Sequence, residues 1–184
     1  MSIQQSCIEA YRAHKNLKLA AQEVGIPWQT VYVHLRNAGE PVIGDKLRYG
    51  SDTDKLAARG EQMFASFVPE AHNSNSGKFQ SKIDFLVQGY GVDVKTSKLK
   101  LSHKACKQRR WAFSLKKQEM LADFFVCFCL DEVGDQLLMT LLVPGELIRR
   151  YQTISLSERG GKWADYEISY NELRSFFKSL PSKQ

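Results

Sequence analysis

The segment KIDFLVQGYGVDVKTSK, which runs from Lys82 to Lys98, decides the fold of the region around it. Apolar residues alternate with other residues on both sides of a Gly-Tyr-Gly sequence, and this pattern is typical of a β-hairpin with one buried face. Three charged residues, Asp84, Asp93 and Lys95, lie within the pattern. The segment therefore predicts two paired strands that carry two carboxylates and an ammonium group.

The expected register of the hairpin brings these three charges together. A two-residue turn at 89–90, or a four-residue loop with the same symmetry, places Asp84 opposite Lys95. Because side chains alternate along a strand, Asp84, Asp93 and Lys95 then emerge on one face of the hairpin. The expected core face carries the apolar side chains of Ile83, Phe85, Val87, Val92 and Val94. The alternative is a solvated surface salt bridge, a kind of pair that contributes little to stability.

Two carboxylates at one point can hold a hard divalent cation through oxygen. Mg²⁺ is the expected ion because it keeps several waters and bridges to phosphate, and Mn²⁺ is the expected substitute. Such a cation polarises a phosphodiester and lowers the pKa of a bound water. A neighbouring lysine orients that water or stabilises the negative charge that develops in the transition state.

The residues that follow the hairpin are strongly basic. No acidic residue occurs from Val94 to Gln118, and the whole chain of 184 residues has a formal charge of +6. A basic run is usually a solvated face, but one of this length with aromatic residues inside it favours contact with phosphates. The candidates for DNA contact in this run are Lys98, Lys100, Lys104, Arg109 and Arg110.

The segment NLKLAAQEVGIPWQTVYVHLRNAG, residues 16–39, predicts two short helices around a tight turn at Gly25. With Ala21, Gly25, Val31 and Leu35, the pattern resembles a DNA-binding helix-turn-helix. By this resemblance the second helix would lie in the major groove. It would present Trp28, Gln29, Thr30, Tyr32, His34 and Arg36, of which Gln29 and Arg36 suit base edges. A helical hairpin that packs on another protein surface is the alternative.

The remaining elements indicate a mixed β-sheet flanked by helices, an α/β fold. Helices are predicted at 56–68, 115–124, 146–154 and 169–180, the last opened by a capping box of Ser169 with Glu172, and further strands at 111–115, 124–132, 135–145 and 162–169. We expect three parts: a helix-turn-helix module at 1–38, a linker at 39–54 and a catalytic domain at 55–184. The sequence shows no membrane-length apolar run and no secretory signal, so a soluble cytoplasmic protein is expected.

The cysteine residues predict buried thiols and no zinc site. Cys127 and Cys129 alternate within an apolar run, so both are expected on one buried face of a strand. His103 and Cys106 have a spacing that loosely suits a zinc ligand pair, but no second pair completes the site.

Asp84 followed by Asp93-Val94-Lys95 across a hairpin resembles the PD-(D/E)xK nuclease superfamily, whose fold is restriction-endonuclease-like. The resemblance covers roughly 55–180. It implies that Asp84, Asp93 and Glu61 are metal ligands and that Lys95 is the catalytic lysine. It also implies an active-site role for Gln118, on the helix expected after the motif. Ile83 stands where many members of the superfamily have proline.

The resemblance and the added helix-turn-helix together predict a Mg²⁺-dependent, site-specific endonuclease of duplex DNA, of the homing or restriction type. A duplex cutter needs two active sites, so a homodimer or homotetramer is expected. The protein would be DNA-associated in the nucleoid and encoded by a phage or mobile element. Two alternatives stay open: a non-catalytic helix-turn-helix DNA-binding protein on the same scaffold, and a structure-specific nuclease that resolves junctions.

Overall fold

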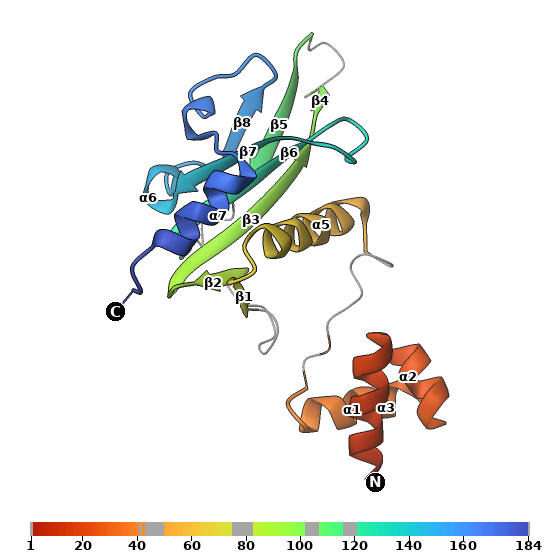
Figure 1. The fold of residues 1–184 in the computed structure, drawn as a ribbon. Helices are drawn as coiled ribbons and strands as arrows, with labels where there is room; N and C mark the ends of the chain where they lie inside the picture. The colour runs from red at the N-terminus through yellow and green to blue at the C-terminus, as the bar shows by residue number, and fades with distance from the viewer. Residues whose placement is uncertain are drawn as a thin grey trace. The chain divides into compact units, whose positions relative to one another are not determined.

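The computed structural model describes residues 2–40, 42, 50–74, 83–101, 107–115 and 121–183. The chain divides into two compact units, an N-terminal helical unit and a C-terminal unit of mixed α/β structure (Figure 1). Among the helices in these ranges, none is long and apolar enough to span a membrane.

The helical unit contains α1 (Ile3–His14), α2 (Leu17–Val24) and α3 (Trp28–Asn37). Asn16 caps α2 with its side-chain oxygen, and Gly25 ends the helix with a φ of 75°, a conformation that glycine adopts without strain. The helices share a core formed by Cys7, Ala10, Tyr11, Ala20, Ala21, Val31 and Leu35. The two short helices and the glycine turn that the sequence predicts are therefore present.

The α/β unit is built on a mixed sheet. Its described strands, in spatial order, are β1 (His72–Asn73), β2 (Phe85–Val87), β3 (Tyr90–Lys98), β6 (Phe124–Leu130) and β7 (Leu137–Pro144). β3 and β6 run parallel, whereas the other neighbouring pairs are antiparallel. This agrees with the mixed sheet that the sequence predicts.

A smaller antiparallel sheet packs against the central one. It consists of β4 (Lys100–Leu101), β5 (Arg109–Ser114) and β8 (Thr153–Ser157). Trp111 on β5 donates its indole N–H to the backbone oxygen of Leu130 at 2.6 Å. The N–H of Ala112 donates to the hydroxyl of Ser97 on β3 at 3.0 Å. These bonds tie the small sheet to β3 and to the end of β6.

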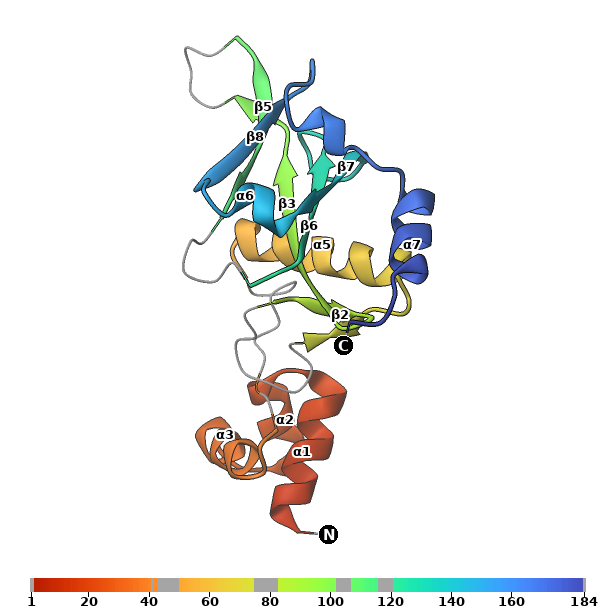
Figure 2. The same ribbon diagram turned by 90° about the vertical axis from the view of Figure 1, so that its left-hand side faces the viewer.

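The two faces of the central sheet are both covered (Figure 2). On one face lie α5 (Asp52–Phe67) and α7 (Tyr170–Ser179). Phe64 of α5 packs there on Phe85 and Phe177, with ring centroids 4.9 and 5.6 Å apart. On the other face, β5, β8 and the short α6 (Gly145–Ile148) cover a second core. Phe125, Cys127 and Cys129 point into this second core, which confirms that both cysteines are buried and on one face.

Four predicted elements differ in the structure. The helix predicted at 146–154 ends at Ile148, and β8 begins at Thr153, because Ile154 and Leu156 alternate into the second core. The strand predicted at 162–169 is a 3₁₀ turn, η3 (Ala164–Tyr166), followed by an isolated bridge from Glu167 to Leu141. The helix predicted at 56–68 begins earlier, at Asp52, within the stretch predicted as linker. Of the helix predicted at 115–124, residues 116–120 lie outside the described residues, Leu115 and 121–123 are not helical, and Phe124 begins β6.

α5 approaches β3 closely at Gly60. A Cβ atom at this position would overlap the hydroxyl of Thr96 and lie 3.5 Å from the nearest methyl of Val94. The Thr96 hydroxyl is itself buried and has no hydrogen-bond partner within the described ranges. Glycine is therefore required for this helix to lie against the strand that carries Asp93 and Lys95.

We expect Gly60→Ala to destabilise the protein by about 1–2 kcal/mol. Overpacking of this kind costs about 1–3 kcal/mol, and the better helix propensity of alanine offsets up to about 1 kcal/mol of it. Urea denaturation measures the change. Thr96→Ala removes the overlapping hydroxyl, so the double variant should recover most of the loss. Equal losses with and without the Thr96 substitution would contradict this close approach.

Candidate active site

The turn between β2 and β3 is formed by Gln88 and Gly89, one residue earlier than the sequence predicts. Their φ angles are 52° and 85°, and two successive positive φ values define a type I′ hairpin turn. Val87 therefore pairs with Tyr90, and Phe85 pairs with Val92. The predicted turn at 89–90 is wrong because the sequence offers glycine at both 89 and 91, and either could supply a tight turn.

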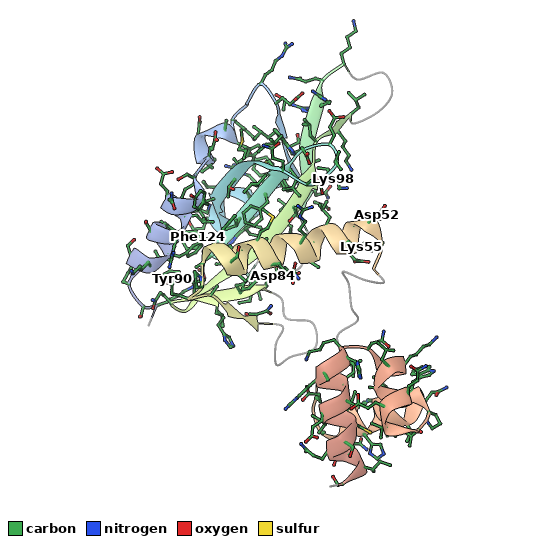
Figure 3. All side chains as sticks on the ribbon, turned by 45° about the vertical axis from the view of Figure 1, so that its right-hand side comes forward. Asp52, Lys55, Asp84, Tyr90, Lys98 and Phe124 are labelled. Atoms are coloured by element: carbon green, nitrogen blue, oxygen red, sulfur yellow. The ribbon has the colours of Figure 1, made fainter. Side chains whose placement is uncertain are left out.

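The corrected register differs from the predicted one by two residues. The even shift leaves the paired strand residues from Phe85 to Val92 on their predicted faces, and continuing it by one residue places Asp84 across from Asp93 instead of Lys95. Asp84 precedes β2 (Figure 3), and its N–H donates to the backbone oxygen of Val92 at 3.1 Å. Its carboxylate accepts the N–H of Val94 at 2.8 Å. The Asp84 carboxylate is thus fixed against the backbone of β3, beside Asp93.

Asp93 and Lys95 form an ion pair on β3, with Lys95 Nζ 2.6 Å from Asp93 Oδ1. Residues two apart on a strand point to the same face, so the long lysine side chain reaches its neighbour along the strand. The side chains are 15% exposed for Asp93 and 28% exposed for Lys95. This is a largely buried pair, and it differs from the solvated surface salt bridge that was the alternative from the sequence.

The face that carries Asp93 and Lys95 is also a core face, which the sequence did not predict. On β6, Asp93 pairs with Phe125 and Lys95 pairs with Cys127, and both partners belong to the second core. Ile83, which was expected on the opposite core face, packs on this second core instead. The charged groups therefore lie at the border of an apolar layer.

This environment raises the pKa of Asp93 to about 7. The largest cause is burial, which disfavours the charged carboxylate. Lys95 opposes the rise, whereas the Asp84 carboxyl reinforces it through a shared hydrogen bond and like charge. Asp84 and Asp93 thus form a close carboxyl pair that favours holding a proton when no cation is present.

The donor set of this pair fits Mg²⁺. Oδ2 of Asp84 accepts the N–H of Val94, and Oδ1 of Asp93 accepts from Lys95 Nζ. The second oxygen of each carboxylate can therefore be a cation ligand. Mg²⁺ is bound in many proteins through one or two carboxylates plus water and substrate phosphate. Two aspartates at the end of a strand pair are sufficient for that mode.

The described structure does not test the predicted roles of Glu61 and Gln118. Glu61 lies on α5, next to Gly60, and α5 packs on the opposite face of β3. No group of three acidic, histidine or cysteine residues suited to a metal occurs among the residues described. Glu61 as a metal ligand stays a prediction, and Gln118 lies outside the described residues.

The basic run is only partly available to a nucleic acid. Arg109 is ion-paired with both Glu132 and Glu158, so its charge is already compensated. Arg110 and Lys100 are exposed, and Lys98 is half-buried near the far end of β3 from Asp84 (Figure 3). Lys104 lies outside the described residues. Arg109 is therefore a weaker candidate for phosphate contact than the exposed Lys100 and Arg110.

The side chains predicted to face DNA lie on the outer side of α3. Trp28 and Tyr32 are 43% and 39% exposed, and Gln29, Thr30 and Arg36 are also exposed. His34 is half-buried, and its backbone oxygen accepts a bond from Gln4. Val31 and Leu35 face the core. α3 thus presents a continuous row of polar and aromatic side chains.

Sequence reasoning missed two residues that hold the hairpin. The N–H of Lys183 donates to the backbone oxygen of Gln88 at 2.9 Å, and its Nζ lies 2.6 Å from Asp123 Oδ1. The other oxygen of Asp123 accepts the N–H of Gly91 at 2.8 Å. Asp123 and Lys183 together clamp the turn that sets the register. No local sequence signal connects residues this far apart.

No protein-family model matches the chain, and no curated protein matches it in sequence.

We expect Asp93 to make the free energy of unfolding fall as pH rises from about 4 to about 7, in the absence of divalent cations. In the folded state Asp93 holds its proton up to a pH of about 7, whereas an unfolded aspartate loses its proton at about 3.9. In that window the folded state binds more protons, so raising the pH favours unfolding.

Urea denaturation of the wild type and of Asp93→Asn across this range measures the effect. The wild type should lose stability relative to the variant as pH rises. Asp165→Asn, at an exposed position on η3, is the control and should follow the wild type. A difference between wild type and Asp93→Asn that does not change with pH would contradict the raised pKa.

Proposed function

We propose that this chain is a Mg²⁺-dependent endonuclease that hydrolyses phosphodiester bonds of duplex DNA, with an active site of the PD-(D/E)xK type. The observation that carries the proposal is the close approach of Asp84, Asp93 and Lys95 at β3. Two carboxylates and one ammonium group at this spacing match the chemistry of cation-assisted phosphoryl transfer.

Burial favours a functional role for these groups over a structural one. A buried ion pair loses solvation that its own attraction only partly restores, so it is weak evidence for stability. Here a second carboxylate, Asp84, adds repulsion to the pair. Perturbed groups of this kind cluster at functional sites because catalysis and cation binding use them.

The carboxylates of Asp84 and Asp93 would hold the cation. Bound there, Mg²⁺ supplies Lewis-acid chemistry that polarises the scissile phosphodiester. Lys95 lies beside them with its ammonium partly shielded from water. It can orient the attacking water and stabilise the negative charge that develops on the phosphorus oxygens, and its effect is larger where water is excluded.

We expect Asp84→Ala and Lys95→Ala each to lower DNA cleavage by at least about 10²–10³-fold, the usual loss for one electrostatic contact to a transition state. Binding of duplex DNA should change little, because the hairpin is not the main proposed contact. Nicking and linearisation of plasmid DNA measure cleavage. Asp165→Ala removes an exposed carboxylate on η3 and should cleave as the wild type does.

Cation dependence tests the same site. A chelator should abolish cleavage, Mg²⁺ or Mn²⁺ should restore it, and Ca²⁺ should permit binding while slowing the cut. Cleavage that persists in the chelator, or in both alanine variants, would refute the proposed active site.

The helical unit would serve as the DNA reader, with α3 in the major groove. Gln29 and Arg36 have side chains suited to base edges, and both are exposed on α3. Two such sites are needed to cut both strands, so the proposal includes a homodimer or homotetramer.

We expect Gln29→Ala and Arg36→Ala each to weaken specific DNA binding by about 5- to 100-fold, since a base contact of this kind contributes about 1–3 kcal/mol. Gel-shift titration of the full chain on a selected binding site measures this. Gln22→Ala, an exposed change on α2, should bind as the wild type does. Equal affinity of all three variants would argue against α3 as the reader and favour a structure-specific nuclease.

The exposed row on α3 also supports a second candidate, a DNA-binding protein without catalysis. That function would be favoured if the α3 variants lose binding while the wild type fails to cut DNA in Mg²⁺.

A further inference from the structure

A cluster of cationic and aromatic side chains lies between α6 and η3, outside the candidate active site. It consists of Arg150, Tyr151, Lys162 and Trp163, and is called here the Lys162 cluster. Lys162 Nζ donates to the Tyr151 hydroxyl at 2.9 Å. The same atom lies 4.2 Å from the ring centroid of Tyr151 and 4.8 Å from that of Trp163. Arg150 lies 5.8 Å from the Tyr151 centroid.

The positive charges of this cluster are not paired with carboxylates. Within the described ranges, neither Arg150 nor Lys162 forms an ion pair, whereas Arg109 on the neighbouring strand forms two. The hydrogen bond from Lys162 lowers the pKa of Tyr151, and the charges of Lys162 and Arg150 act in the same direction. The local field therefore favours a negative charge beside the Tyr151 hydroxyl.

The cluster is anchored and so holds its cations in place. Trp163 is only 6% exposed, and its ring meets that of Tyr151 edge to face at a centroid distance of 5.3 Å. Lys162 and Arg150 are exposed. Because Lys162 lies over the Tyr151 ring and Trp163 covers its edge, a nucleobase cannot stack freely there. A phosphate fits better, since Lys162 and Arg150 donate and the Tyr151 hydroxyl keeps its own proton to donate.

The Lys162 cluster packs on the second core, which lies on the face of the central sheet that carries Asp93 and Lys95. Tyr151 and Trp163 pack on the second core, to which Phe125 and Cys127 also belong. Phe125 and Cys127 are the β6 partners of Asp93 and Lys95. The Lys162 cluster and the Asp93–Lys95 pair therefore border the same apolar core.

We propose that Arg150, Tyr151 and Lys162 form a phosphate-binding surface for the sugar-phosphate backbone of duplex DNA. The choice of DNA as the polyanion rests on the proposed function. The contact is independent of base sequence, and it would add affinity that α3 does not supply.

The test measures binding of the full chain to a fluorescent duplex of unrelated sequence by anisotropy, in a chelator so that no cleavage occurs. The variant is Arg150→Gln with Lys162→Gln. The matched control is Arg174→Gln with Lys178→Gln, two exposed positions on α7, which covers the opposite face of the sheet. Both double variants lower the net charge by two, so general attraction to DNA changes equally.

We expect the Arg150/Lys162 variant to bind about 10-fold more weakly, with a salt dependence reduced by nearly two counterions, since each phosphate contact contributes about 0.9 to the slope. The control should change far less. Equal weakening in both double variants, or none in the Arg150/Lys162 variant, overturns the phosphate-binding surface.

Two further measurements separate the possible failures. Because Lys162 packs on two rings, its substitution can destabilise the fold, and thermal unfolding of each variant measures this. The charge-conserving variant Arg150→Lys with Lys162→Arg should retain DNA binding if positive charge is what binds the phosphate. Loss of binding in this charge-conserving variant at unchanged stability would contradict the role of charge. Wild-type protein that binds duplex but does not cut it in Mg²⁺ refutes the endonuclease and leaves the surface standing. Wild-type protein that binds no duplex refutes both.

Discussion

The constraint on which the candidate site depends is the two-residue turn at Gln88 and Gly89. Positive φ angles at both positions fix which residues of β2 and β3 face each other. A slip by one residue would turn Asp84 to the other face of the hairpin, away from Asp93 and Lys95. Glycine adopts this conformation without strain, whereas a residue such as Gln88 needs support from its surroundings. The bond from Lys183 to the Gln88 oxygen supplies part of that support.

The second physical feature is that the central sheet is buried on both faces. One face of β3 meets the helices α5 and α7, and the other meets β5, β8 and α6. Asp93 and Lys95 therefore lie beside apolar side chains and not in open solvent, and burial is the main reason that the Asp93 pKa rises to about 7. The same burial that destabilises the charges strengthens their interaction with any cation or phosphate that replaces water.

The parts of the fold that local signals encode are predictable from the sequence. Asn16 caps the start of α2 and Gly25 ends it, and a capping box of Ser169 with Glu172 opens α7. Each of these signals acts over only a few residues. Alternation also predicts correctly that Asp93 and Lys95 share a face of β3. The prediction that Asp84 faces Lys95 was wrong because Gly89 and Gly91 each allow a tight turn, and the two turns give different registers.

Other parts depend on contacts that no local pattern records. The first two residues of β8, Thr153 and Ile154, were predicted as the end of a helix because residues 146–154 suit either structure until β5 is known to lie beside them. The position of Ile83 and the existence of the second core were missed for the same reason. Alternation indicates that one face of a strand is buried, but it does not indicate whether the other face is also covered. The Lys162 cluster joins residues 11 positions apart through an intervening strand and turn, and such pairings carry no periodic signal.

The clamp by Lys183 and Asp123 has a consequence for the order in which the site assembles during folding. The turn at Gln88 and Gly89 closes a loop of two residues, whereas the bond from Ser182 to Gln88 spans 94 residues and that from Lys183 to Asp123 spans 60. Closing long loops loses more chain entropy, so contacts of low sequence separation form first. The hairpin thus acquires its register early from its own turn, and it becomes rigid only after α7 has packed and brought Lys183 into reach.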